Sequence, residues 1–273
     1  MSQQHSSLAR VQPIFNQLLD QWPGGETWLG ELWEMAARRR PGVALARPEE
    51  LGSLVASDTP LDHAARLGQV YERTLAPPAA FLSWLLENPG ALQVRDPTAF
   101  GAKSDDAKAW RAKLFSGDQH LVGEAQREGL NQLGKRLAQR GRNKWWAFEG
   151  FSRIDCCLIT DACVLFVEGN CTEGAASSTL WFPRRTQLWR NVEAAGEFAG
   201  GKPFAVMLGV EHEANGAAAL ADAERSLAGS YPHLDARQRA ELSRHLIGFV
   251  TWGDVVTRFG LRPESLLDSA PKC

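Results

Sequence analysis

The sequence predicts an α/β protein with a central mixed sheet flanked by helices and a helical N-terminal portion. Apolar residues recur at helical spacing in the first hundred residues, and strand-like runs rich in aromatic and β-branched residues follow residue 144. These runs alternate with helical segments, a pattern typical of a sheet covered on both faces. The chain has 273 residues, of which 44% are hydrophobic and 23% charged, so a sizeable buried core is expected.

The first of two expected units is the helical N-terminal portion, residues 1–103. Ile14 and Leu18 fall on one helical face before a Pro-Gly-Gly break, and two further helices are expected near 60–76 and 78–88, each bounded by proline. No group of chemically reactive residues occurs in this portion. We therefore interpret it as a scaffold or as a part that shapes a substrate site.

The second expected unit, residues 104–273, is predicted to form the α/β core. Ser104-Asp105 and Ser116-Gly117-Asp118 are typical helix-start signals. The first expected elements are a helix over 119–140 and two strands over 145–159 and 163–167, joined by a turn at Thr160-Asp161. A helix over about 184–198 follows, beginning near Pro183. The last expected elements are a strand over 204–210, a helix over 235–247 and a strand over 249–252.

Charge and targeting signals limit the classes of partner. The formal net charge of −2 gives no overall basic footprint, so any nucleic-acid surface has to be local. Two basic clusters qualify: Lys135, Arg136, Arg140, Arg142 and Lys144, which we interpret as a solvated helix end, and Arg184, Arg185 and Arg190. The N-terminus lacks the pattern of a signal peptide and no apolar run reaches the roughly 20 residues of a membrane span, so we expect a cytoplasmic protein with no membrane partner.

Two carboxylates interrupt strands that are otherwise apolar. Asp155 lies within Arg153-Ile154-Asp155-Cys156-Cys157, and Glu168 ends Val164-Leu165-Phe166-Val167-Glu168. Burying a charge is expensive without a cation, a metal or hydrogen-bond donors nearby. With a two-residue turn at Thr160-Asp161, Asp155 pairs with Phe166, and Asp155, Glu168 and Asn170 point to one face. The Cβ atoms of the two acids are then about 7 Å apart, which suits a shared divalent ion bound through oxygens.

This pattern resembles the D-x(n)-(D/E)-x-K signature of the PD-(D/E)XK, or restriction-endonuclease-like, nuclease superfamily. Asp155, twelve intervening residues and Glu168-Gly169-Asn170 match its spacing, and the segment Arg184–Asn191 resembles the following helix, with Gln187 as its glutamine. The string around Glu168 is similar to an "EGK-x-TE" version of the motif. The resemblance covers residues 145–210 and implies catalytic roles for Asp155, Glu168, Asn170 and Gln187, with Mg²⁺ or Mn²⁺ held by Asp155 and Glu168, and phosphodiester hydrolysis on nucleic acid.

Asn170 departs from the family pattern, because the family has lysine at this position. That lysine is thought to orient the attacking water and to stabilise negative charge on the phosphorus centre. Asparagine brings hydrogen bonds but no positive charge, and loss of a placed charge typically costs about a hundredfold in rate. Arg153, which would pair with Glu168 in the expected register, and the arginines at 184, 185 and 190 are candidates to replace it.

Other interpretations remain open. The acids could form a salt-bridged strand end with Arg153 or Lys144, and Gln187 could be a surface residue. Three further acids could belong to the site. Glu124 could instead be a structural ion-pair partner, and Glu149 could lie on a solvated strand edge. Glu173 would lie in the loop after the motif, where it could support the metal ligands. The chain could also be an inactive nuclease-like module that binds nucleic acid or a protein partner, or an unrelated α/β enzyme. No P-loop, G-x-S-x-G or GxGxxG motif supports the latter.

The cysteines allow a test of the expected reducing compartment. The chain has five cysteines without a CxxC pair, and Cys156, Cys157 and Cys163 lie in apolar runs. We expect all five to be free thiols, because buried thiols in a reducing compartment stay reduced. Thiol counting on denatured, non-reduced protein should find five, and a native disulfide would contradict the cytoplasmic assignment.

Overall fold

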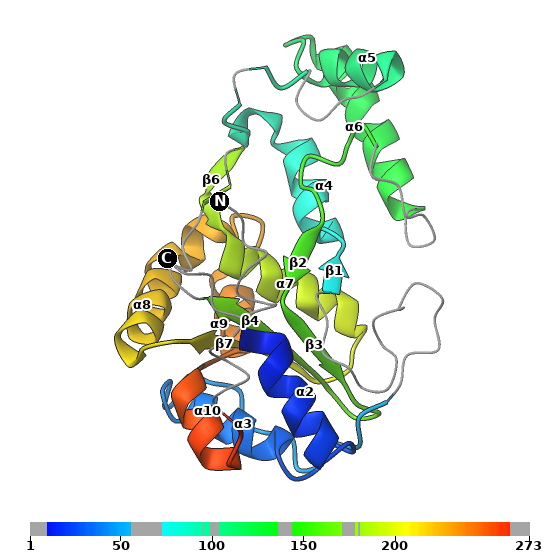
Figure 1. The fold of residues 1–273 in the computed structure, drawn as a ribbon. Helices are drawn as coiled ribbons and strands as arrows, with labels where there is room; N and C mark the ends of the chain where they lie inside the picture. The colour runs from blue at the N-terminus through cyan, green and yellow to red at the C-terminus, as the bar shows by residue number, and fades with distance from the viewer. Residues whose placement is uncertain are drawn as a thin grey trace, which may run out of the picture.

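The fold is mixed α/β, with a mixed sheet flanked by helices, as the sequence predicts (Figure 1). The computed structural model describes residues 10–55, 73–94, 96–98, 104–135, 144–170, 178–179 and 181–262. The described helices are α2 (Gln12–Gln21), α3 (Leu29–Ala37), α4 (Ala79–Glu87), the 3-10 helix η2 (Pro89–Ala91), α5 (Asp105–Leu114), α6 (Gln119–Gly134), α7 (Gln187–Ala199), α8 (Glu213–Ser230), α9 (Ala236–Arg244) and α10 (Trp252–Phe259).

The central sheet has four strands in the order β3-β4-β7-β8. Strands β3 (Cys156–Ile159) and β4 (Val164–Asn170) are antiparallel, whereas β7 (Phe204–Val210) and β8 (Leu246–Thr251) continue the sheet in parallel. Every residue of β7 is buried, as expected for an inner strand covered on both faces. Two small antiparallel sheets pair β1 (Arg73–Leu75) with β2 (Ser152–Ile154), and β5 (Ser178–Thr179) with β6 (Phe182–Thr186).

Each face of the central sheet has its own hydrophobic core. On one face, α2, α3 and α10 pack on the side chains that include Cys156, Leu165 and Val167. On the other face, α7 and α8 pack on Val164 and Phe166, together with Leu208 of β7. The faces of β4 therefore alternate, as its pleat requires. The next even-numbered position, Glu168, is on the α7 face.

A third core forms a separate aromatic-rich lobe. It joins α4, α5 and α6 to Trp145, Trp146, Phe148, Trp181 and Phe182. Figure 1 shows α5 and α6 far from α2, α3 and α10, with the sheet between them. This core combines residues from both sides of position 103, where the sequence analysis divides the chain, while α2 and α3 belong to the sheet.

Several predicted elements agree with the structure. The strand over 204–210 is β7, and the helices near 78–88 and 119–140 are α4 and α6, although residues 136–143 lie outside the described part. Ser104 caps α5 and Asp118 caps α6 through their side chains, as their sequence signals indicate.

Other element boundaries were wrong. The expected strand over 145–159 is two short strands that separate at Asp155, and the helix expected to begin near Pro183 begins at Gln187, because residues 182–186 form β6 with Thr186 as the helix cap. A helix was also expected over 60–76. Residues 73–75 of this range form strand β1, and residues 56–72 lie outside the described part.

The C-terminal part differs from the prediction as well. Helix α8 was missed, because its apolar face is built from small alanine side chains that give weak periodicity. The helix expected over 235–247 ends at Arg244, and the buried residues Leu246 and Ile247 already belong to β8. Among the described residues, no helix combines the length and apolar character that crossing a bilayer requires.

Gly209 of β7 is a test of packing at the inner strands. A Cβ atom on Gly209 would lie 2.1 Å from Cζ2 of Trp252, a buried ring with little freedom to move. We expect Gly209→Ala to lower the free energy of unfolding by about 1–3 kcal/mol through overpacking, measured by urea denaturation. Gly134→Ala is the matched control, because a Cβ there meets no atom within 4 Å. Equal stability of the two variants would contradict the packing of Trp252 on this strand.

Candidate functional site

The β3–β4 hairpin that carries the acids has a different register from the expected one. Ile159 pairs with Val164, and Thr160 donates its amide hydrogen to the carbonyl of Cys163, so the two turn residues are Asp161 and Ala162. The expected turn at Thr160-Asp161 was wrong by one position. Moving a turn by one residue shifts the pairing by two, which preserves the face of each side chain. Extended by one residue, this register sets Asp155 directly opposite Glu168 rather than diagonal to it.

Asp155 lies at a bend between β2 and β3. The ladder with β4 ends at the Cys156–Val167 pair, and β2 turns away to pair with β1. The Asp155 carboxylate continues the contact with β4, because its Oδ2 accepts a hydrogen bond of 2.8 Å from the amide of Gly169. This carboxylate is therefore joined to β4 by a side-chain hydrogen bond and not by the backbone ladder.

Glu168 is partly buried on the α7 face of β4. Its Oε2 accepts a hydrogen bond of 3.2 Å from Nδ2 of Asn191, a fully buried residue of α7. The same Nδ2 lies 3.5 Å from the carbonyl oxygen of Arg153. Asn191 thus contacts both chain segments that carry the acids.

The remaining predicted site residues occupy nearby backbone positions. Asn170 is the last residue of β4, in register with Val210 of β7, and Gln187 is the first residue of α7, one helical turn before Asn191. The side chain of Asn170 and the loop with Glu173 lie outside the described residues. The predicted pairing of Arg153 with Glu168 was wrong, because Arg153 pairs with Thr74 on β1.

The donors at this position suit a hard divalent cation. Mg²⁺ prefers oxygen ligands and is commonly bound by one or two carboxylates together with waters. Within the described ranges, no three His, Cys, Asp or Glu side chains gather to hold a metal. An ion at this position would have Asp155 and Glu168 as its carboxylate ligands. Oδ1 of Asn191 is buried and has no hydrogen-bond partner among the described residues, while Nδ2 of the same amide contacts Glu168. The residues therefore fit such an ion in chemistry.

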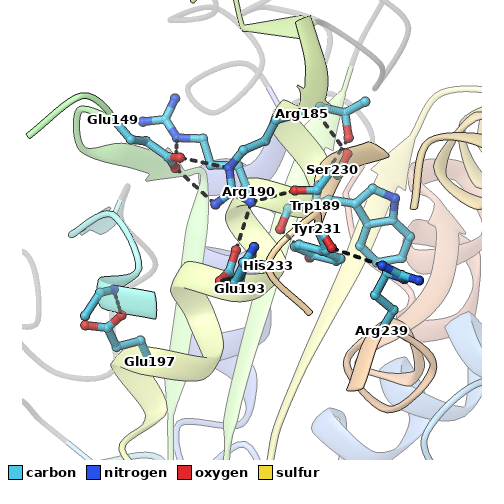
Figure 2. Close-up of polar contacts among 12 residues, drawn as sticks. Glu149, Arg185, Trp189, Arg190, Glu193, Glu197, Ser230, Tyr231, His233 and Arg239 are labelled. Atoms are coloured by element: carbon cyan, nitrogen blue, oxygen red, sulfur yellow. Dashed lines mark hydrogen bonds and ion pairs between the residues drawn. The ribbon is translucent and has the colours of Figure 1, made fainter. Parts of the chain in front are cut away.

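A buried ion cluster occupies the adjoining face of α7 (Figure 2). The guanidinium of Arg185 lies 2.8 Å from Oε2 of Glu149 and 2.8 Å from Oε2 of Glu193, while Nε of Arg190 lies 2.7 Å from Oε1 of Glu149. His233 Nε2 is 2.7 Å from the other oxygen of Glu193. Two carboxylates thus face two guanidiniums in a largely buried position.

The ion cluster corrects two sequence interpretations. Glu149 is fully buried and not on a solvated edge, and Arg185 and Arg190 are paired with carboxylates, so they are not available as substitutes for the family lysine. Glu124, on α6, pairs with Lys113 at 2.9 Å in the aromatic lobe. The signal that could have identified the cluster is the placement of charged residues within apolar segments on 145–150 and 184–193.

Burial and charge act in opposite directions in this cluster. Burial by itself lowers the pKa of Arg185, but Glu149 and Glu193 outweigh burial and raise it. Burial likewise acts to raise the pKa of Glu193, while Arg185 and His233 lower it below its usual value. Burial lowers the pKa of Arg190, against the effect of Glu149. Glu193 is therefore held as a carboxylate by its partners.

A groove of about 650 Å³ lies elsewhere, between α3, α10 and the start of α8. Its charged residues are paired with one another: Arg39 lies 2.6 Å from Asp254, and Arg258 lies 3.1 Å from Glu31. These ion pairs are exposed or partly exposed, and such pairs contribute little to the stability of the fold. We therefore place the candidate site at Asp155 and Glu168 and not in this groove.

Comparison with protein-family models, with curated proteins and with solved structures gives no match to this chain. Its interpretation consequently depends on its own residues.

Arg185 allows a test of the ion cluster. We expect Arg185→Met to lower the free energy of unfolding by about 3–5 kcal/mol, because it leaves Glu149 and Glu193 buried with too little positive charge. Arg244→Met is the control: Arg244 pairs with Glu241 on the exposed face of α9, and its loss should cost less than about 1 kcal/mol. Chemical denaturation monitored by tryptophan fluorescence measures both, and a stable Arg185→Met protein would contradict the cluster.

Proposed function

We propose that this protein hydrolyses phosphodiester bonds of nucleic acid with a divalent metal, Mg²⁺ or Mn²⁺, held by Asp155 and Glu168. The observation that carries the proposal is the position of these two acids on neighbouring segments, one bonded to Gly169 and the other inside β4. The resemblance of this segment to the PD-(D/E)XK pattern supports the same chemistry. Two carboxylates on neighbouring segments supply the oxygen ligands that a divalent cation prefers.

Each residue has a distinct part in this proposal. Asp155 and Glu168 bind the metal and orient it, and a bound divalent ion supplies a water of lowered pKa and a clamp for the scissile phosphate. Gln187 stands at the first position of α7, where its amide could orient substrate or water. Asn170 takes the lysine position at the end of β4.

A second candidate function is a nuclease-like module that binds nucleic acid without cutting it. It is favoured by Asn170 in place of lysine, and by Arg185 and Arg190, whose charges are compensated by Glu149 and Glu193. Without a basic group at the reacting phosphate, a loss of about a hundredfold or more in rate is expected. Metal binding would persist in such a module.

Asn170→Lys decides between the two functions. If the fold binds metal but lacks the charge, the introduced ammonium should create nuclease activity or raise it by about a hundredfold. The assay uses labelled single- and double-stranded DNA and RNA with Mg²⁺ or Mn²⁺. Asp155→Ala should remove activity in either background, because metal binding precedes the contribution of the basic group.

Glu241→Gln, an exposed change on α9, is the control for preparation and contaminating nucleases. High activity of the unmodified protein that Asp155→Ala abolishes would show that another group replaces the lysine. Absence of both activity and Mn²⁺ binding in every variant would exclude a metal-dependent nuclease.

A further inference from the structure

We propose that Asn191 is the positioning residue of the acid pair: its side-chain amide sets the separation of Asp155 and Glu168. This inference depends on the proposed metal site for its functional meaning, but its structural part can be tested without metal. It begins from the ladder between β3 and β4, which ends at Cys156 and Val167. Asp155 and Glu168 lie one residue beyond this last pair of the ladder.

Because the ladder stops, other contacts must hold the segment of Arg153–Asp155 against β4. One is the bond from the Gly169 amide to the Asp155 carboxylate, at 2.8 Å. Another comes from Asn191, whose Nδ2 donates to Glu168 Oε2 at 3.2 Å and lies 3.5 Å from the carbonyl oxygen of Arg153. One amide group thus joins the Glu168 carboxylate to the backbone two residues before Asp155.

The chemistry of asparagine suits this position. A side-chain amide has two N–H donors, and the two acceptors at Asn191 are a carboxylate and a peptide carbonyl. The reverse orientation would place Oδ1 against both oxygens and is disfavoured by repulsion. Binding of Oε2 by the amide fixes the rotation of the Glu168 carboxylate. Such contacts around metal-binding carboxylates typically change metal affinity by 10–100-fold when they are lost.

The helix that carries Asn191 is itself fixed relative to the same segment. Arg190, the preceding residue, donates to the carbonyl oxygen of Gly150 at 2.6 Å and pairs with Glu149. Helix α7 is therefore bonded to positions 149, 150 and 153 in turn, on the approach to Asp155. Asn191 is the part of this connection that reaches Glu168.

The test uses Asn191→Asp and Asn191→Leu in the full chain. Asn191→Asp keeps the shape of the side chain and removes both N–H donors, and Asn191→Leu removes them without adding charge to the interior. In metal-free protein, amide hydrogen exchange followed by NMR should be about tenfold faster at Gly169 in both variants, because Asp155 is no longer held in place. Amides of the central ladder, such as that of Val206, should keep their protection.

Two controls separate positioning from general loss of packing. Val192→Ala removes buried apolar contacts from the same helix and leaves the amide of Asn191 in place, so it should not accelerate Gly169 selectively. Asp155→Ala removes the acceptor of the Gly169 amide and should reproduce the fast exchange. The proposal is overturned if Gly169 keeps wild-type exchange in both Asn191 variants, or if Val192→Ala gives the same selective change.

Titration calorimetry with Mn²⁺ adds the functional readout. We expect Asn191→Leu to bind Mn²⁺ about tenfold more weakly than the wild type, whereas Val192→Ala should retain wild-type affinity. Asn191→Asp is left out of this measurement, because its added carboxylate could itself bind the metal. Wild-type affinity in Asn191→Leu would overturn the role at the site. If Gly169 responds as expected but the wild type binds no Mn²⁺, the positioning role stands and the proposed nuclease function fails.

Discussion

The buried pairing of Arg185 with Glu149 and Glu193 is the interaction on which the rest of the candidate site depends. These groups are buried, and an uncompensated buried charge costs several kcal/mol. The cluster joins the loop before β2, strand β6 and helix α7 at one point. The Arg185 guanidinium also stacks on Phe81 of α4, at 3.7 Å from the ring centroid, so the aromatic lobe meets the core at the same residue.

A buried ion pair is not by itself a gain in stability, because desolvation offsets much of the Coulomb attraction. Its consequence here is geometric. Nε of Arg190 lies 2.7 Å from Oε1 of Glu149, and a displaced α7 would separate these two buried charges. The helix is thereby fixed in rotation, with Asn191 directed to Glu168. Apolar packing alone tolerates small shifts that a buried charge does not.

The proposed site combines carboxylates that would suit a metal with an asparagine that would weaken catalysis. Asp155 accepts a hydrogen bond from the backbone amide of Gly169, and Glu168 accepts one from the buried amide of Asn191. Asn170 stands where a charged lysine would complete the family pattern. The two buried arginines on β6 and α7 cannot supply that charge, since each is engaged by a carboxylate. The two proposed functions, a metal-dependent nuclease and a module that binds without cutting, therefore differ by one positive charge at the site.

The sequence by itself determined the α/β class, the inner strand β7 and the candidate acids, because these follow from local periodicity and from charges within apolar runs. The turn was misplaced by one residue. A two-residue shift in pairing keeps the face of every residue inside the ladder, but Asp155 lies one position beyond the end of that ladder. Only the tertiary structure decided that β3 stops before Asp155, that Glu149 is buried and that Asn191 reaches Glu168. These features depend on contacts between segments 20 to 40 residues apart, and local spacing carries no information about which distant charge will neutralise another.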